Sequence, residues 1–126
     1  PPMAPAAHVD SKDWARAIGT NLHATGRLIA MTAPLLQAAA RGRALFFADS
    51  GRVGAAHFGA YGASKAAQEA LVASWQAESA RTGPEVHLLR PRPMSTALRA
   101  RFHPGEDRAA LTSPADEARR LLAALG

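Results

Sequence analysis

The sequence contains no cysteine, and aromatic residues make up only 6% of it. Without cysteine the protein has no disulfides, no thiolate metal site and no cysteine nucleophile, which agrees with a reducing compartment. Alanine and leucine dominate the apolar residues, so closely packed helices are favoured over an all-β fold. At 126 residues, the chain has room for one domain.

Long apolar stretches are missing as well. Arg, His or Gln interrupts each apolar run before it reaches the roughly 18 residues that a membrane-spanning helix needs. No signal-peptide pattern opens the sequence either. We therefore predict a cytoplasmic protein with no membrane partner.

The net charge of +5 and the sequence pI near 11.0 come mostly from arginine. A basic chain invites the hypothesis of a nucleic-acid partner, which would predict salt-dependent retention on DNA or heparin. However, the arginines are scattered in ones and twos, with no aromatic residues between them to stack on bases. We therefore expect no nucleic-acid partner.

No metal site is expected. The histidines never stand three or four residues apart, as two ligands on one helix face would, and no carboxylate cluster accompanies them. Packing or surface roles suit them better than metal binding. These residues are His8, His23, His57, His87 and His103.

One long helix is predicted over residues 14–40, because apolar residues recur there at spacings of three and four. Asp10 is a candidate cap, and Pro34 is a possible site of a bend. Gly19 and Gly26 each cost about 1 kcal/mol inside a helix, so they indicate close approach by another backbone or a ligand.

Two short apolar runs, "ALFFA" (44–48) and "EVHLL" (85–89), predict buried strands, and residues 59–80 between them predict a second helix. This βαβ arrangement predicts parallel strands with a right-handed crossover. Two strands alone leave edges and faces uncovered, so we expect further strands from sequence outside this chain or from a second copy.

The remaining segments lie at the two ends. Residues 1–9 lack periodicity and predict an extended lead-in, and residues 92–112 mix Pro, Arg and Gly and predict a loop with one or two short turns. Ser113 followed by Pro114 is a strong helix start, which places a final helix in residues 113–126.

Tyr61 and Lys65, in "GAYGASKAA", form the one chemically suggestive pair. A spacing of four puts both side chains on one helix face, where an ammonium favours the phenolate and lowers the pKa of the phenol. The alternative is a partly buried tyrosine beside a solvated lysine. Neither a serine-hydrolase elbow around Ser64 nor a phosphate-binding loop in "GRVGAAHFG" is present.

The context of this pair resembles the second half of a short-chain dehydrogenase/reductase. "WARAIGTNLHATG" is similar to the long helix of that family, "AYGASKAA" to its active-site helix and "RPRPMST" to its Pro-Gly loop ending in Thr, and "FHPGEDRAALTSPADEARRLL" resembles the substrate loop and final helix of one subgroup. The resemblance implies an α/β fold, the C-terminal half of a Rossmann-like doubly wound parallel sheet. Residues 1–126 would then form one partial domain.

What the resemblance implies about function is specific. Tyr61, Lys65 and Asn21 match the catalytic residues: the tyrosine exchanges a proton with a carbonyl or alcohol, the lysine lowers the tyrosine pKa and holds the nicotinamide ribose, and the asparagine orders a water. Tyr61, Lys65, Pro91 and Thr96 would contact the cofactor, NAD or NADP. The partners would be a small carbonyl or alcohol substrate and a second copy, paired through the two long helices.

Three departures from the family pattern stand out. Counting thirteen residues back from Tyr61, to the place of the family serine, gives Ala48, while alignment from the strand gives Asp49 with Ser50 beside it. The Pro-Gly step is Pro91-Arg92. The Gly-rich nucleotide fingerprint is missing and is expected before Pro1. A weakly active or inactive scaffold of the same family therefore stays as an alternative.

Overall fold

A computed structural model describes residues 3–126, so the first two residues of the predicted lead-in lie outside the described residues. The chain divides into a first unit that ends at Leu88 and a second unit, Leu89–Gly126. Within residues 3–126, no helix has both the length and the hydropathy of a membrane span.

The predicted first long helix is present, but its hydrogen bonding changes along its length. It consists of α1 (Ser11–Ile18), a π-helical turn η2 (Gly19–His23) and α2 (Ala24–Ala38), and the backbone stays helical across both junctions. The Asp10 side chain caps it by accepting from the backbone N–H of Lys12 at 2.7 Å.

The glycines of this helix do not mark a close approach. A Cβ added at Gly19 would meet nothing within 4 Å, and one at Gly26 would meet only the Leu71 side chain at 3.8 Å, an ordinary contact. The expectation of a neighbouring backbone at these positions is therefore wrong for the described residues. Gly19 instead begins the π turn, where the hydrogen-bond pattern changes.

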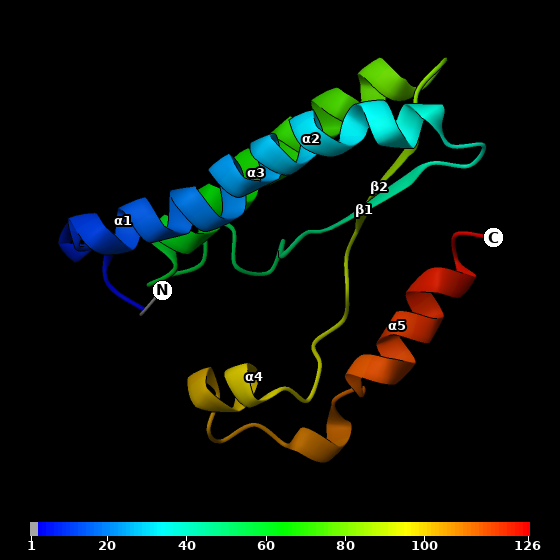
Figure 1. The fold of residues 1–126 in the computed structure, drawn as a ribbon. Coiled ribbons are helices and arrows are strands. Elements are labelled where there is room, and N and C mark those ends of the chain that lie inside the picture. Colours follow the sequence, from blue (N-terminus) through cyan, green and yellow to red (C-terminus); the bar gives the residue numbers. More distant parts are fainter. Residues whose placement is uncertain (1–2) are drawn as a thin grey trace. The chain divides into compact units, whose positions relative to one another are not determined.

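The predicted βαβ arrangement is confirmed. β1 (Arg43–Phe47) and β2 (Glu85–Leu89) pair in parallel, and α3 (Gly59–Ser79) connects them. In Figure 1 the long helices run beside one another over the strands, and α3 packs along α1 and η2. The crossover thus carries the chain from the carboxyl end of β1 through α3 to the start of β2.

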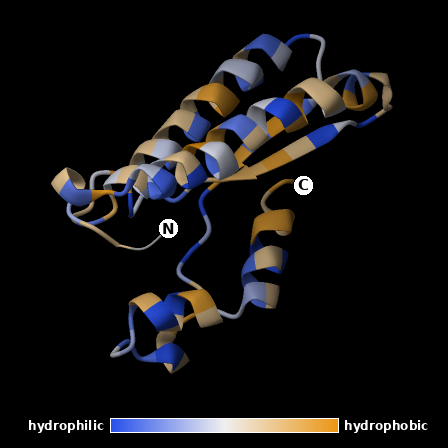
Figure 2. Cartoon of the chain, turned by 60° about the vertical axis from the view of Figure 1, so that its left-hand side comes forward, coloured by the Kyte–Doolittle hydropathy of each residue, from blue (hydrophilic) through white to orange (hydrophobic). Residues whose placement is uncertain are grey.

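The core of the first unit lies between these helices and one face of the two strands. Val72 and Trp75 of α3 and Val86 of β2 are buried at its centre. The Phe46 ring meets the Trp75 ring edge-on, with centroids 6.1 Å apart. Both strands are mostly hydrophobic in Figure 2. The other side chains packed on this centre are Ile29, Ala33, Leu36, Ala44 and Leu88.

The lead-in differs from its prediction in one respect. It contains a 3-10 turn, η1 (Ala6–His8), and it is tied to the start of α3 by a bridge between Ala4 and Phe58. The backbone N–H of Ala4 donates to the carbonyl of His57 at 3.1 Å. Contacts with a distant segment, which local composition does not reveal, hold this stretch in place.

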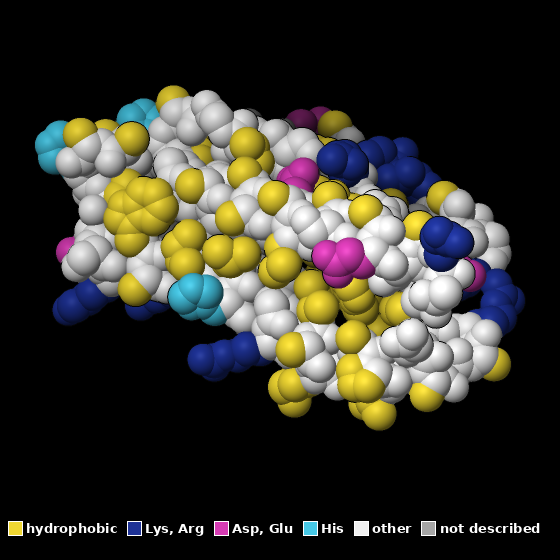
Figure 3. Space-filling model, turned by 90° about the horizontal axis from the view of Figure 1, so that it is seen from above, with side chains coloured by type: hydrophobic (Ala, Val, Ile, Leu, Met, Phe, Trp, Pro, Cys, Tyr) yellow, Lys and Arg dark blue, Asp and Glu magenta, His cyan; other side chains and the backbone are white. Residues whose placement is uncertain are grey.

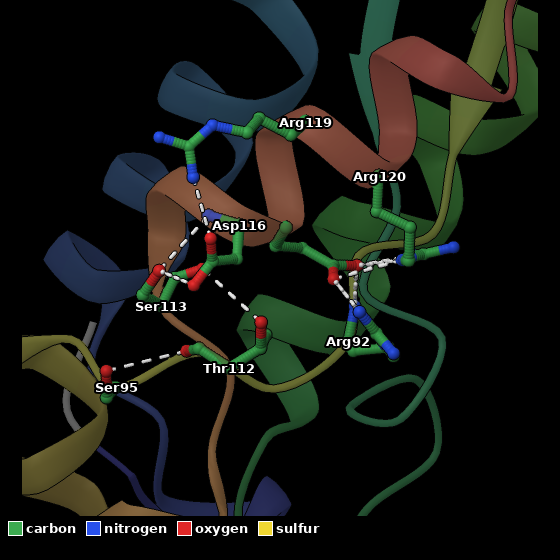
Figure 4. A network of polar contacts seen from close by, with 8 residues as sticks. Arg92, Ser95, Thr112, Ser113, Asp116, Arg119 and Arg120 are labelled. Carbon is green, nitrogen blue, oxygen red and sulfur yellow. Dashed lines mark hydrogen bonds and ion pairs between the residues drawn. The ribbon is translucent and has the colours of Figure 1, made fainter.

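The second unit contains more helix than predicted. Residues 92–112 include α4 (Ala97–Phe102) and the 3-10 turn η3 (Arg108–Ala110). The final helix α5 (Pro114–Ala123) begins as predicted, because the Ser113 side chain accepts from the backbone N–H of Asp116 at 3.1 Å. The Ser95 backbone N–H donates to the carbonyl of Thr112 at 3.0 Å, and the Ser95 hydroxyl donates to the same carbonyl at 3.4 Å (Figure 4), which draws the two ends of the 92–112 stretch together.

Candidate active site

Tyr61 lies in the first turn of α3, and its ring is half-buried against Phe58, edge-on at 6.4 Å between centroids. Its hydroxyl donates to Asp49 Oδ2 at 2.9 Å. Asp49 lies two residues beyond the last residue of β1. The phenol therefore points at the carboxyl end of that strand.

The pKa of Tyr61 is raised, in contrast to the lowering expected from Lys65. Burial is the largest cause, because it disfavours the charged phenolate. The hydrogen bond to Asp49 and the negative charge of Asp49 raise the pKa further, and only the positive charge of Arg52 opposes them. Tyr61 is thus held as a neutral phenol, since its nearest charged partner is an anion.

Lys65 follows one turn later and is buried, although it is a lysine. Its ammonium donates to the carbonyl of Phe47 at 2.6 Å and to Gln68 Oε1 at 2.6 Å. Burial lowers the pKa of Lys65, while the charges of Asp49 and Glu69 act in the opposite direction. Like Tyr61, Lys65 reaches the carboxyl end of β1, because Phe47 is the last residue of that strand.

Asn21 sits in the π turn and connects to the same helix face. Its Nδ2 donates to Ser64 Oγ at 2.8 Å, and Ser64 Oγ donates to the carbonyl of Tyr61 at 2.7 Å. The Ser64 side chain is fully buried. The structure thus brings the predicted residues Tyr61, Lys65 and Asn21 together in the first unit.

Two further residues close this network. Gln68 Nε2 donates to Thr25 Oγ1 at 2.8 Å, and Thr25 Oγ1 donates to the carbonyl of Asn21 at 2.7 Å. A path of side-chain hydrogen bonds therefore runs from Lys65 through Gln68 and Thr25 to the π turn. Buried networks of this kind, when every member is satisfied, fix the geometry of their members.

The other predicted cofactor residues, Pro91 and Thr96, lie in the second unit. Both are partly buried. The Thr96 hydroxyl caps α4 by accepting from the backbone N–H of Arg99 at 3.2 Å. That hydroxyl therefore has a structural role in the start of α4.

Arg92, which replaces the family glycine after Pro91, is bound by a buried carboxylate. Glu117 Oε1 accepts from the Arg92 backbone N–H at 2.8 Å, and Glu117 Oε2 accepts from Nε and Nη2 of its guanidinium, each at 2.9 Å. Arg120 also donates to Glu117 (Figure 4). These bonds, led by those of Arg120, lower the pKa of Glu117 to about 2. The long cation is thus held within its own unit.

Comparison with known proteins agrees with this arrangement. The family profile described as short chain dehydrogenase matches residues 1–107. The chain belongs to the short-chain dehydrogenase family.

Two kinds of relative illustrate the membership. The chain is 33% identical over 115 residues to the uncharacterized oxidoreductase YciK of Escherichia coli (strain K12), covering 90% of this chain and 45% of the relative. Among solved structures, a short chain dehydrogenase from Salmonella enterica serovar Typhi CT18 superposes with a TM-score of 0.84 at 32% identity, over 91% of this chain and 48% of that one. A structure from Shigella flexneri 2a, complexed with NADP, gives 0.80 at 31% identity, over 91% and 48%. The chain spans about half the length of these relatives.

As a short-chain dehydrogenase, the chain contains site residues that the sequence pattern did not identify. Gln68 and Thr25 lie three residues after Lys65 and four after Asn21, so each shares a helix face with a predicted residue, which is a detectable signal. Asp49 is one of the two positions that match the family serine in the sequence, but its bond to Tyr61 depends on the path of a loop. No local pattern encodes that path.

Proposed function

We propose that this chain is part of an NAD(P)-dependent oxidoreductase that transfers hydride between a nicotinamide and a small carbonyl or alcohol substrate. One observation carries the proposal: the Tyr61 phenol and the Lys65 ammonium both reach the carboxyl end of β1, through Asp49 and Phe47. Ligands of open α/β sheets bind beyond the carboxyl ends of the strands.

The donor set there fits one end of a nicotinamide cofactor. A phenol hydroxyl and an ammonium, one helical turn apart, are suited to the hydroxyls of a ribose. When bound, the reduced nicotinamide supplies the hydride. NADP in a related structure supports a nicotinamide cofactor for this chain, and both NAD and NADP are candidates.

Tyr61 is the proposed general acid and base. In reduction, the O–H bond of Tyr61 would break and its proton would bond to the carbonyl oxygen, while a bound reduced nicotinamide would supply the hydride for the carbonyl carbon, so that C=O would become CH–OH. Oxidation of an alcohol reverses these transfers. Asn21, anchored by Ser64, is proposed to orient a water that exchanges protons with this site.

The second unit carries the remaining candidate site residues. Pro91 and Thr96 are the candidate cofactor contacts there, residues 92–112 the candidate substrate loop and residues 113–126 the final helix. Residues 1–126 together would form one partial domain, the C-terminal half of the Rossmann-like fold. Its nucleotide-fingerprint half would lie in sequence before Pro1.

We also propose that the protein is cytoplasmic and that two copies of it pair through the long helices. On α2, the side chains of Leu28, Met31 and Leu35 are 55%, 71% and 71% exposed, at spacings that place them on one face. Hydrophobic side chains also gather on the face seen in Figure 3, with Lys and Arg mostly toward its margins. An apolar face of this kind suits an isologous interface.

The catalytic proposal is tested with Tyr61→Phe in the protein expressed from its full native reading frame. The change keeps the ring that packs on Phe58 and removes only the hydroxyl. We expect NADPH- or NADH-dependent reduction of at least one aldehyde or ketone in a panel, with a loss of 10²-fold or more in the variant, on the order of general acid catalysis. Undiminished activity in the variant would overturn the role of Tyr61.

The scaffold alternative predicts no activity with either cofactor across the panel. The similarity to oxidoreductases and the presence of Tyr61, Lys65 and Asn21 in one hydrogen-bonded site favour the enzyme. A weakly active scaffold would also tolerate Tyr61→Phe without change. The same assay therefore separates the two.

A further inference from the structure

A carboxylate contacts the one hydroxyl on which the proposed chemistry depends. Asp49 Oδ2 accepts the hydrogen bond of the Tyr61 hydroxyl at 2.9 Å, and the Asp49 side chain is partly buried. The family pattern has a serine near this position, which donates to a developing oxyanion. An ionised carboxylate only accepts hydrogen bonds, so Asp49 favours the protonated phenol, whereas the family serine acts as a donor.

The loop that carries Asp49 is fixed against α3. The backbone N–H of Arg52 donates to the carbonyl of Asp49 at 3.0 Å, which closes a turn. A Cβ added at Gly62 would meet the carbonyl oxygen of Arg52 at 2.8 Å, so the loop passes within backbone contact of the helix. The Arg52 guanidinium also lies over the Phe58 ring, 4.8 Å from its centroid.

Each segment next to Asp49 and Tyr61 carries a charged side chain that acts on this site. Asp49 follows β1, Arg52 lies in the loop, and Lys65 and Glu69 lie on α3. The charge of Arg52 opposes that of Asp49 at the phenol, and at the ammonium of Lys65 the charge of Asp49 acts together with that of Glu69. The charge of Asp49 therefore acts on both groups, on the phenol and on the ammonium that was expected to ionise it.

We infer that Asp49 is a positioning residue that fixes the Tyr61 hydroxyl and keeps it protonated in the resting site. This inference rests on the proposed function for its catalytic meaning. A protonated Tyr61 suits carbonyl reduction. Alcohol oxidation needs a base that accepts the alcohol proton, and it would become effective only at alkaline pH.

The composition of the chain offers a direct readout. Tyr61 is its only tyrosine, so the ultraviolet absorbance of tyrosinate in the isolated chain reports this residue alone. The chain has two tryptophans, both in the first unit: Trp75 is buried in the core and Trp14 is 39% exposed, so a change in their combined fluorescence reports at each pH whether that unit is folded. For the wild-type chain we expect less phenolate at pH 10 than the half-ionisation of free tyrosine.

Asp49→Asn and Asp49→Ala are the test variants, and Asp13→Asn is the control with the same charge change. Both test variants should lower the midpoint of the tyrosinate titration by about one pH unit, or about tenfold more phenolate at a given pH below the midpoint. The control should leave it unchanged. An unchanged midpoint in folded Asn and Ala variants would overturn the inference.

Activity then separates this inference from the proposed function. In the protein from its full reading frame, the alkaline rise of alcohol oxidation should begin at lower pH in Asp49→Asn than in the wild type. A shifted titration combined with identical pH profiles would overturn the catalytic meaning of Asp49. A shifted titration with no activity in any form would overturn the proposed function while supporting the local role of Asp49.

Discussion

The side-chain amide of Asn21 donates to the hydroxyl of Ser64 at 2.8 Å, across 43 residues of sequence. The Ser64 hydroxyl in turn donates to the carbonyl of Tyr61. This fully buried serine thus links the π turn of the first helix to the helix that carries the proposed acid and base. Removing the Ser64 hydroxyl should therefore affect both the π turn and α3.

Ser64→Ala should lower the free energy of unfolding by about 1–3 kcal/mol, because it leaves the Asn21 amide without its buried acceptor. Urea denaturation followed by tryptophan fluorescence measures the loss. Ser74→Ala is the matched control, since Ser74 also donates to a backbone carbonyl but is exposed, and it should change stability by no more than about 0.5 kcal/mol. Equal effects from both variants would contradict the proposed link.

The sequence predicted those elements whose signals are local. β2 begins and ends as its apolar run suggested, and α5 starts where Ser113 and Pro114 placed it. The first helix was predicted in extent but not in its π turn, since contacts such as that between Asn21 and Ser64 join distant segments. α4 was missed, because its Thr96 cap follows a proline-rich stretch that favours a loop.

The candidate site was also predicted only in part. Tyr61, Lys65 and Asn21 were identified from motifs, and their convergence is consistent with the prediction. The direction of the Tyr61 pKa shift was predicted wrongly. The spacing of four residues places the ammonium on the same helix face, but it does not reveal the burial of the phenol or its contact with Asp49. The contact between Asp49 and Tyr61 depends on the path of the loop after β1, which the sequence pattern does not reveal.

Lys65 should lose its proton below the ordinary lysine value of 10.5, because burial disfavours the ammonium. The chain has only two lysines, Lys12 and Lys65, so ¹³C-lysine NMR gives two sets of signals to follow with pH. Lys12→Arg assigns them. A Lys65 midpoint at or above 10.5 would contradict the buried placement of its ammonium.

Glu117 should make the protein sensitive to acid. Its pKa in the folded state, about 2, lies below the ordinary value of 4.5, so the unfolded state binds more protons and stability is lost as pH falls through this window. Thermal unfolding across that range should show a smaller loss in Glu117→Gln than in the wild type. Glu78→Gln, on the exposed surface of α3, should behave like the wild type. Parallel curves for wild type and Glu117→Gln would contradict the ion pairing with Arg92 and Arg120.

The proposed pairing of two copies predicts a dimer that depends on α2. Analytical ultracentrifugation should show the dimer for the wild type and a shift to monomer when Met31 and Leu35 are both changed to Gln, because this buries polar groups in the interface. Leu98→Gln removes a comparably exposed leucine, 66% exposed, from α4 and should leave the dimer intact. A wild-type protein that sediments only as monomer would refute the pairing.

The π turn at Gly19–His23 also limits how the length of this helix can vary. Such a turn accommodates an additional residue while the flanking helical segments keep their own sides against α3. Deleting one residue within the turn would convert it to regular α-helix and keep both flanking segments on their sides, whereas a deletion in α1 or α2 would rotate everything on one side of it by about 100° relative to the other. Homologous chains should therefore show single-residue gaps at the turn more readily than in α1 or α2.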